Sequence, residues 1–197
     1  MKQKKIKEKN VPIEISARHI HLSREDLGVL FGKNYKLTRL KKLSQGSDFA
    51  AEEKVEIEAN EETIKNVRIV GDIREKTQLE LTFSDSYKLK MDIPVRLSGD
   101  IALTPGFRII GPAGVVVKKE GMIIAKRHLH ISPKEAEEFG LKDGETVSVT
   151  CGDQRKTTYH EVKVRISETF HLSTHIDTDE ANAMGIKICS IGKINLD

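Results

Sequence analysis

The sequence of 197 residues has no tryptophan and two cysteines, and aromatic residues make up only 5% of it. Cys151 and Cys189 lie far apart, and neither belongs to a Cys-x-x-Cys pair. We therefore expect two reduced thiols, and not a disulfide or a zinc–thiolate site. No apolar run approaches the ~20 residues that a membrane-spanning helix requires.

Targeting and nucleotide-binding motifs are also missing. The first ten residues contain five lysines and no apolar stretch, which is not the pattern of a secretory signal. We expect residues 1–10 to form a flexible basic tail and the protein to be cytoplasmic, with no membrane or nucleic-acid partner. There is no P-loop, dinucleotide fingerprint or Gly-x-Ser-x-Gly elbow, which disfavours nucleotide hydrolysis, hydride transfer and a serine nucleophile.

One short phrase, however, occurs twice. Arg18-His19-Ile20-His21-Leu22-Ser23 matches Arg127-His128-Leu129-His130-Ile131-Ser132, and the two copies hold four of the seven histidines. Because side chains alternate along a strand, the two histidines of each pair point the same way and can chelate one cation. The repetition predicts a two-metal or split-metal site. Zinc is the default, and cobalt, nickel or iron stay open. The alternative is two pairs of buried structural imidazoles.

Other candidate ligands are less distinctive. His175 is a plausible further ligand because it also lies at a predicted strand-to-helix junction. For His160 and His171 we expect ordinary surface or core roles. Glu80 alternates with the apolar Leu79 and Leu81, so strand spacing alone predicts a solvent-facing carboxylate.

Short alternating segments separated by turns predict a mainly β fold of barrels or sandwiches. The residues from Val11 to His21 alternate well enough to read as one strand. The other predicted strands are Val55–Ala59, Ile64–Val70, Thr77–Phe83, Tyr87–Ile93, Phe107–Ile110, Val115–Lys118, Met122–His130, Glu145–Cys151, Tyr159–Ile166 and Ile188–Ile191. Lys41 and Lys42 are assigned to a loop that could meet a polyphosphate or simply stay solvated.

Capping signals predict helices after Ser23, Ser132 and Asp177, ended by Gly32, Gly140 and Gly185. Each cap lies two residues beyond a histidine. Since helix N-termini favour anions, the three junctions indicate a negatively charged substrate. The two histidine phrases lie 109 residues apart in similar contexts, which indicates two halves related by a pseudo-two-fold axis.

Taken together, the motifs resemble one family, the PduL-type phosphotransacylases, also called phosphate propanoyltransferases. The likeness covers nearly everything from Val11 to Gly192. The motifs that carry it are Ser16-Ala17-Arg18-His19-Ile20-His21-Leu22-Ser23, Leu43-Ser44-Gln45, Phe49-Ala50-Ala51-Glu52-Glu53, Thr77-Gln78-Leu79-Glu80, Pro94-Val95-Arg96-Leu97-Ser98-Gly99-Asp100, Arg127-His128-Leu129-His130 and His175-Ile176-Asp177-Thr178-Asp179-Glu180-Ala181-Asn182.

The resemblance implies two small β-barrels with short capping α-helices, interleaved in sequence. Residues 11–17 and 126–197 would form the first barrel. Residues 18–31 and 53–125 would form the second, with 32–52 as a small excursion.

The resemblance also implies an acyltransferase that interconverts a short-chain acyl-CoA (propanoyl-CoA or acetyl-CoA) plus phosphate with acyl phosphate plus CoA. Two zinc ions would be held, one by His19, His21 and Glu80 and the other by His128, His130 and His175. Arg74 would be the catalytic, phosphate-binding arginine. The residues implied to contact CoA are Ser16, Lys41, Arg68 and Asn182.

The chain departs from the family pattern at two places. Ser44-Gln45-Gly46-Ser47 replaces the usual Ser-Gln-Pro-Gly, and Gly71-Asp72-Ile73-Arg74 replaces Gly-Pro-Leu-Arg. Members of the family in bacterial microcompartments often carry an amphipathic N-terminal extension, which the lysine-rich start of this chain does not resemble.

Two other readings stay open from the residues alone: a binuclear metallohydrolase, and a zinc-stabilised binding module that uses the basic tail. The acyl chain, the direction of the reaction and assembly into a homo-oligomer are not fixed by the sequence.

Overall fold

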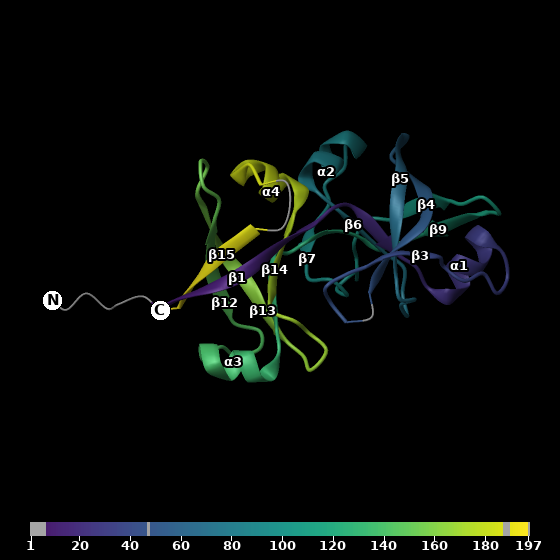
Figure 1. The fold of residues 1–197 in the computed structure, drawn as a ribbon. Coiled ribbons are helices and arrows are strands. Elements are labelled where there is room, and N and C mark those ends of the chain that lie inside the picture. The colour runs from purple at the N-terminus through teal and green to yellow at the C-terminus, as the bar shows by residue number, and fades with distance from the viewer. Residues whose placement is uncertain (1–6, 47, 187–189, 197) are drawn as a thin grey trace. The chain divides into compact units, whose positions relative to one another are not determined.

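The computed structural model describes residues 7–46, 48–186 and 190–196. Within them the chain forms fifteen strands and four short helices (Figure 1), so the predicted mainly β fold is confirmed. Residues 1–6 of the predicted tail, Ser47, Cys189 and the start of the predicted strand Ile188–Ile191 lie outside the described residues. None of the helices in the described part has the length and apolar character that a membrane span requires.

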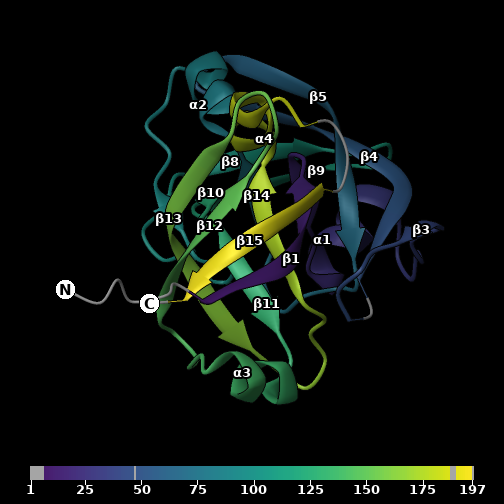
Figure 2. The ribbon, with the colours of Figure 1, turned by 60° about the vertical axis from the view of Figure 1, so that its left-hand side comes forward.

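The chain divides into two compact units, one made of Met1–Ser16 with Lys126–Asp197 and the other of Ala17–Ala125. The first unit is a closed barrel, visible in Figure 2, in which the strands follow the order β1-β14-β11-β13-β12-β15. Its core contains Val11, Leu129 and Ile176. The strand bounds are β1 Lys7–Ser16, β11 His128–Ile131, β12 Thr146–Cys151, β13 Thr157–Ile166, β14 Ser173–Asp177 and β15 Ser190–Leu196.

The second unit is a curled sheet of nine strands with its own core, which includes Ile20, Leu79 and Ile109. Its strand order is β7-β10-β6-β2-β5-β4-β8-β9, and β3 pairs with β4 off this path. The bounds are β2 His19–His21, β3 Arg39–Lys42, β4 Phe49–Ala59, β5 Glu62–Gly71, β6 Gln78–Leu81, β7 Val95–Arg96, β8 Phe107–Ile110, β9 Val115–Lys118 and β10 Met122–Ala125.

The two histidine phrases occupy equivalent places in these sheets. Strand β2 lies between β5, to which it is parallel, and β6, to which it is antiparallel. Strand β11 lies in the same way between the parallel β13 and the antiparallel β14. The internal repeat therefore extends from the sequence phrase to the strand neighbours. The pseudo-two-fold relation between the halves stays a prediction.

The predicted single strand from Val11 to His21 is wrong. Strand β1 ends at Ser16 in the barrel, and β2 begins at His19 in the other sheet, because each half pairs with different neighbours. Lys7–Asn10, predicted as part of a flexible tail, pair with β15 and extend β1. The predicted strand Met122–His130 likewise separates into β10 and β11, and Lys41 and Lys42 belong to β3.

The three helices predicted from their caps are confirmed: α1 Arg24–Phe31, α3 Pro133–Phe139 and α4 Thr178–Met184. A fourth helix, α2 Phe83–Leu89, begins at the residue where the predicted strand Thr77–Phe83 was expected to end. The predicted strand Tyr87–Ile93 is wrong, because its first residues belong to α2 and the others form no strand. The N-cap of α2, Thr82, and the third helix residue, Asp85, form a complete capping box. This signal is present in the sequence, but the alternating apolar residues Leu79, Leu81 and Phe83 favoured a strand.

Candidate metal centres

The first group of possible metal ligands lies in the sheet of the second unit and consists of His19, His21 and Glu80. Strand register places Glu80 directly opposite His19 on the neighbouring β6. The two Nε2 atoms of the histidines are 3.1 Å apart, and Oε2 of Glu80 lies 3.6 Å from Nε2 of His19. These spacings bring three donor atoms around one point, as a tetrahedral cation site with an open position requires.

Backbone carbonyls fix both imidazoles of this group. Nδ1 of His19 lies 2.8 Å from the Ala17 oxygen, and Nδ1 of His21 lies 3.0 Å from the Val70 oxygen. Because a carbonyl oxygen can only accept, Nδ1 carries the proton in each ring and Nε2 keeps its lone pair. Burial, with the nearby His19 ring, lowers the pKa of His21 well below its usual range. His21 is therefore neutral and free to coordinate.

Glu80 is buried, so the solvent-facing position predicted from strand spacing is wrong. Burial by itself would raise the pKa of this carboxyl, but His19, His21, a hydrogen bond from Ser98 and the charge of Arg74 together lower the pKa to about 2. Glu80 is therefore an anion throughout the neutral range. An ionised carboxylate beside two imidazoles is a donor set that suits a cation.

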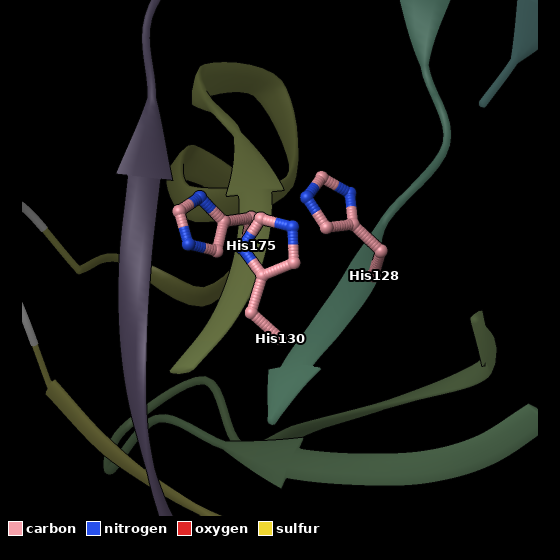
Figure 3. Close-up of side chains that lie close together, drawn as sticks. All are labelled: His128, His130 and His175. Atoms are coloured by element: carbon pink, nitrogen blue, oxygen red, sulfur yellow. The ribbon is translucent and has the colours of Figure 1, made fainter. Parts of the chain in front are cut away.

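The second group lies in the barrel and consists of His128, His130 and His175. Figure 3 shows the first two rings on β11 and the third on the adjacent β14, gathered on one side of the strands. The ring centroids are 4.5 to 5.1 Å apart. His175 lies opposite His128 in strand register, as Glu80 lies opposite His19. Nδ1 of His128 is 2.9 Å from the Lys126 oxygen, which repeats the contact of His19.

His130 gives the clearest sign that this group suits a cation. Its ring is buried, and neither ring nitrogen has a hydrogen-bond partner. Burial and the neighbouring rings of His128 and His175 lower its pKa to about 2, so it is neutral. An unsatisfied buried nitrogen costs on the order of 1–3 kcal/mol, which coordination would offset. The three-imidazole set suits zinc or a similar borderline cation, so the residues present fit such an ion.

Arg74 lies near the first group. Its backbone N–H donates to the Leu22 oxygen at 3.0 Å, just beyond β2. Its Nη1 donates to Ser98 Oγ at 3.1 Å, and its Nη2 lies 3.8 Å from Asp48 Oδ2. Burial raises the pKa of Asp48, against the pull of Arg74. Arg74 also lines an open pocket of about 530 Å³ whose basic members include Arg24 and Lys118. The Arg74 side chain is 34% exposed and is therefore accessible from solvent.

The remaining predicted site residues are spread over both units. In the barrel, Ser16 ends β1 beside Asp177, and Asn182 is exposed on α4. In the second unit, Lys41 is exposed on β3, whereas Arg68 is half-buried on β5 opposite His19. Arg68 Nη1 donates to the Ala51 oxygen at 2.5 Å. Ser16 and Arg68 thus lie on strands that pair directly with a ligand-bearing strand, whereas Lys41 lies on β3, which pairs with β4.

Some residues with a direct role around these groups are not identifiable from sequence spacing. Ser98 and Gln78 both donate to Oε1 of Glu80, at 2.8 and 2.6 Å. Arg18 pairs with Asp85 at 2.8 Å, and Arg127 pairs with Glu180 at 2.7 Å. Both acids stand five residues beyond the third ligand of their group, in the first turn of α2 or α4. In the sequence, the only sign of these two ion pairs is that each acid follows the third ligand of its group at the same spacing of five residues.

Three other candidates lie outside both ligand groups. His160 is exposed and its Nδ1 is 2.8 Å from Ser148 Oγ, in agreement with the ordinary role expected for it. His171 belongs to neither group among the described residues. Cys151 is a buried free thiol.

The free amide groups at the helix starts are partly satisfied by the protein itself, because each N-cap side chain accepts a hydrogen bond from the third amide of its helix.

Comparison with known proteins gives a consistent result. Residues 12–187 match the model of the phosphate propanoyltransferase family. A phosphate propanoyltransferase of Thermotoga maritima is 48% identical over 179 residues, which cover 90% of this chain and 85% of the relative. An enzyme with the same name from Lachnoclostridium phytofermentans is 46% identical over 89% of this chain and 83% of the relative. Another, from Clostridioides difficile, is 42% identical over 95% of this chain and 90% of the relative.

Proposed function

The chain belongs to the phosphate propanoyltransferase family and is therefore an acyltransferase, and from this we propose that it interconverts a short-chain acyl-CoA plus phosphate with acyl phosphate plus CoA. The acyl group would be propanoyl or acetyl. The observation that carries the proposal is the pair of ligand groups built on equivalent strands, one of them joined to an accessible arginine through Ser98.

We assign one zinc ion to His19, His21 and Glu80 and another to His128, His130 and His175. The support is the geometry within each unit, the converging Nε2 atoms of His19 and His21, and the unsatisfied ring nitrogens of His130. When bound, zinc supplies a Lewis acid that stabilises a thiolate and neutralises phosphate charge. The protein's own part is to hold these donors in place and neutral or anionic as coordination requires.

Arg74 is proposed as the residue that binds phosphate. A guanidinium presents two parallel N–H donors, so it can hold two phosphate oxygens and orient the third toward the acyl carbon. Asp48 lies 3.8 Å from Arg74 and would be displaced when phosphate takes its place. Arg74 thus concentrates the nucleophile and keeps it oriented.

For CoA we propose contacts with Ser16, Lys41, Arg68 and Asn182. Lys41 and Arg68 supply positive charge for the phosphates of CoA, and Ser16 and Asn182 supply neutral hydrogen-bonding groups. We also propose that the protein is cytoplasmic and that it acts without nucleic acid or membrane.

In the direction of acyl phosphate formation, a phosphate oxygen forms the new bond to the thioester carbonyl carbon. The carbon–sulfur bond breaks and its electron pair leaves with the CoA thiolate. We propose direct transfer and not an acylated protein. Among the described residues the one cysteine is Cys151, which is buried, and burial raises the pKa of its thiol. A thiol in that state is a poor nucleophile.

The test is an assay of CoA release from propanoyl-CoA and acetyl-CoA, with and without phosphate, on protein of measured metal content. We expect release that requires phosphate and about two zinc ions per chain. Release that proceeds equally without phosphate would identify a hydrolase. A protein that holds zinc but releases no CoA in either condition would support the binding module instead.

A further inference from the structure

Ser98 joins the candidate metal ligand Glu80 to the candidate phosphate ligand Arg74. The serine lies half-buried in the loop after β7, between Leu97 and Gly99, and strand or helix spacing alone assigns it no role. Its Oγ donates to Oε1 of Glu80 at 2.8 Å and accepts from Nη1 of Arg74 at 3.1 Å. One hydroxyl therefore contacts both side chains.

The hydrogen-bonding capacity of this hydroxyl is completely used. Besides Arg74, Ser98 Oγ accepts from Nε2 of Gln78 at 2.9 Å. A serine hydroxyl has two acceptor lone pairs and one proton. Because arginine and the amide nitrogen can only donate, both lone pairs are occupied and the proton points to Glu80. Its direction is therefore set by the protein and not by solvent.

Gln78 reinforces this arrangement. Its Oε1 accepts from the Gly99 amide at 2.7 Å, which fixes the orientation of the side-chain amide. Its Nε2 consequently donates to Oε1 of Glu80 at 2.6 Å as well as to Ser98. Two donors thus hold one oxygen of the carboxylate, and Oε2 is the oxygen that lies 3.6 Å from Nε2 of His19.

We propose that Ser98 is a positioning residue that sets Glu80 for the metal and Arg74 for phosphate at the same time. The inference rests on the proposed function for its phosphate half, whereas its metal half rests on the ligand group alone. Loss of the hydroxyl leaves Oε1 with one donor and frees the guanidinium to turn toward Asp48. Outer-shell partners of this kind typically change metal affinity or activity by about 10–100-fold.

The experiment compares Ser98→Ala, which removes the hydroxyl, with Ser98→Thr, which keeps it. Ser148→Ala is the matched control, because Ser148 also carries a hydrogen-bonded hydroxyl but lies in the barrel beside His160. Zinc affinity of the full-length metal-free proteins is measured by chelator competition. Kinetic constants are measured separately for phosphate and acyl-CoA, and melting temperatures report the fold.

We expect Ser98→Ala to bind one of its two zinc ions about 10–100-fold more weakly. The KM for phosphate should rise several-fold while the KM for acyl-CoA and the melting temperature stay close to those of the wild type. Ser98→Thr should restore zinc affinity and phosphate KM. Ser148→Ala should match the wild type throughout.

The proposal is overturned if Ser98→Ala keeps wild-type zinc affinity and phosphate KM, or if Ser98→Thr is as impaired as Ser98→Ala. An equal rise in both KM values together with a lower melting temperature would show a general structural role and also overturn it. If the wild type needs no phosphate for CoA release, the proposed function fails. The zinc titration still decides whether Ser98 positions Glu80.

Discussion

At the scale of single residues, the ligand groups depend on which atom of each side chain is already engaged. Carbonyl oxygens hold Nδ1 of His19 and His128 at 2.8 and 2.9 Å, in equivalent places of the two units. Donation from Nδ1 gives each ring the tautomer whose Nε2 can act as a metal ligand. In both contacts the acceptor is a backbone carbonyl, so no second side chain is needed to orient the ring.

His128→Ala should remove activity and leave a folded protein. The variant takes one imidazole from the barrel group but leaves the core residues of that unit in place. We expect at least the 10–100-fold loss of activity that outer-shell changes produce, with retention of about one zinc ion. His160→Ala is the control, because His160 is exposed and outside both groups. Wild-type turnover by a His128→Ala protein of verified metal content would count against the assignment.

Asp26 gives a pH-dependent stability that is independent of the metal groups. Burial acts to raise the pKa of its carboxyl, but hydrogen bonds from Thr77 and Lys118 prevail and lower it. The Lys118 ammonium lies 2.9 Å away. A lowered native pKa means that the charged form stabilises the fold above the unfolded value of about 3.9, and that this contribution is lost as pH falls through the native pKa.

Asp26→Asn should therefore lower the free energy of unfolding at pH 7 by about 1–3 kcal/mol. The difference from the wild type should shrink as the pH falls below about 4. Urea unfolding at several pH values measures both effects, with the exposed neighbour change Glu25→Gln as control. A difference that is constant with pH would show that the charge of Asp26 does not contribute.

At the scale of elements, each ligand strand is tied to the helix that follows the third ligand. Arg18, just before β2, pairs with Asp85 in the first turn of α2, and Arg127, just before β11, pairs with Glu180 in the first turn of α4. Both acids also complete the capping box of their helix. The Asp85 side chain is only 2% exposed, so the ion pair with Arg18 offsets part of the cost of its burial.

Arg18→Ala should destabilise the protein by about 1.5–3 kcal/mol, because it leaves a buried carboxylate without its cationic partner. Arg108→Ala is the matched comparison. Arg108 also pairs with an acid, Glu58, at 2.5 Å, but both side chains are substantially exposed. Exposed pairs of this kind contribute about 0–1 kcal/mol. Equal losses of unfolding free energy in the two variants would contradict the importance of the buried partner.

At the scale of the whole molecule, the two units differ in how the chain builds them. Ala17–Ala125 is continuous and contains its own core. The barrel is discontinuous, because β1 pairs with both β14 and β15 and so fills the place between them. Removal of residues 1–16 would leave both of those strands without a partner along one edge.

A fragment of residues 17–125 should accordingly fold alone and bind one zinc ion, whereas residues 126–197 alone should not form a stable barrel. Thermal unfolding followed by circular dichroism and zinc titration test both expectations. His19→Ala in the first fragment is the control for the metal group, since it should lose zinc while it keeps the fold. A fragment 17–125 that fails to unfold cooperatively would show that this unit depends on the barrel.

The sequence by itself determined the mainly β class and three of the four helices. It also determined that the two histidines of each pair point to the same side of their strand. These features are local: strand alternation, capping boxes and glycine stops act over a few neighbouring residues. The family resemblance added Glu80 as an expected ligand and assigned His175, already a candidate, to the second group.

Only the tertiary structure decided where β1 passes into β2, that Phe83–Leu89 is helical, and that Glu80 is buried. It also revealed Ser98 between Glu80 and Arg74, at sequence separations of 18 and 24 residues. Such contacts depend on which strands pair and where the loops between them end. Alternation along one segment carries no information about its neighbours, because register and partner choice are set by the whole sheet.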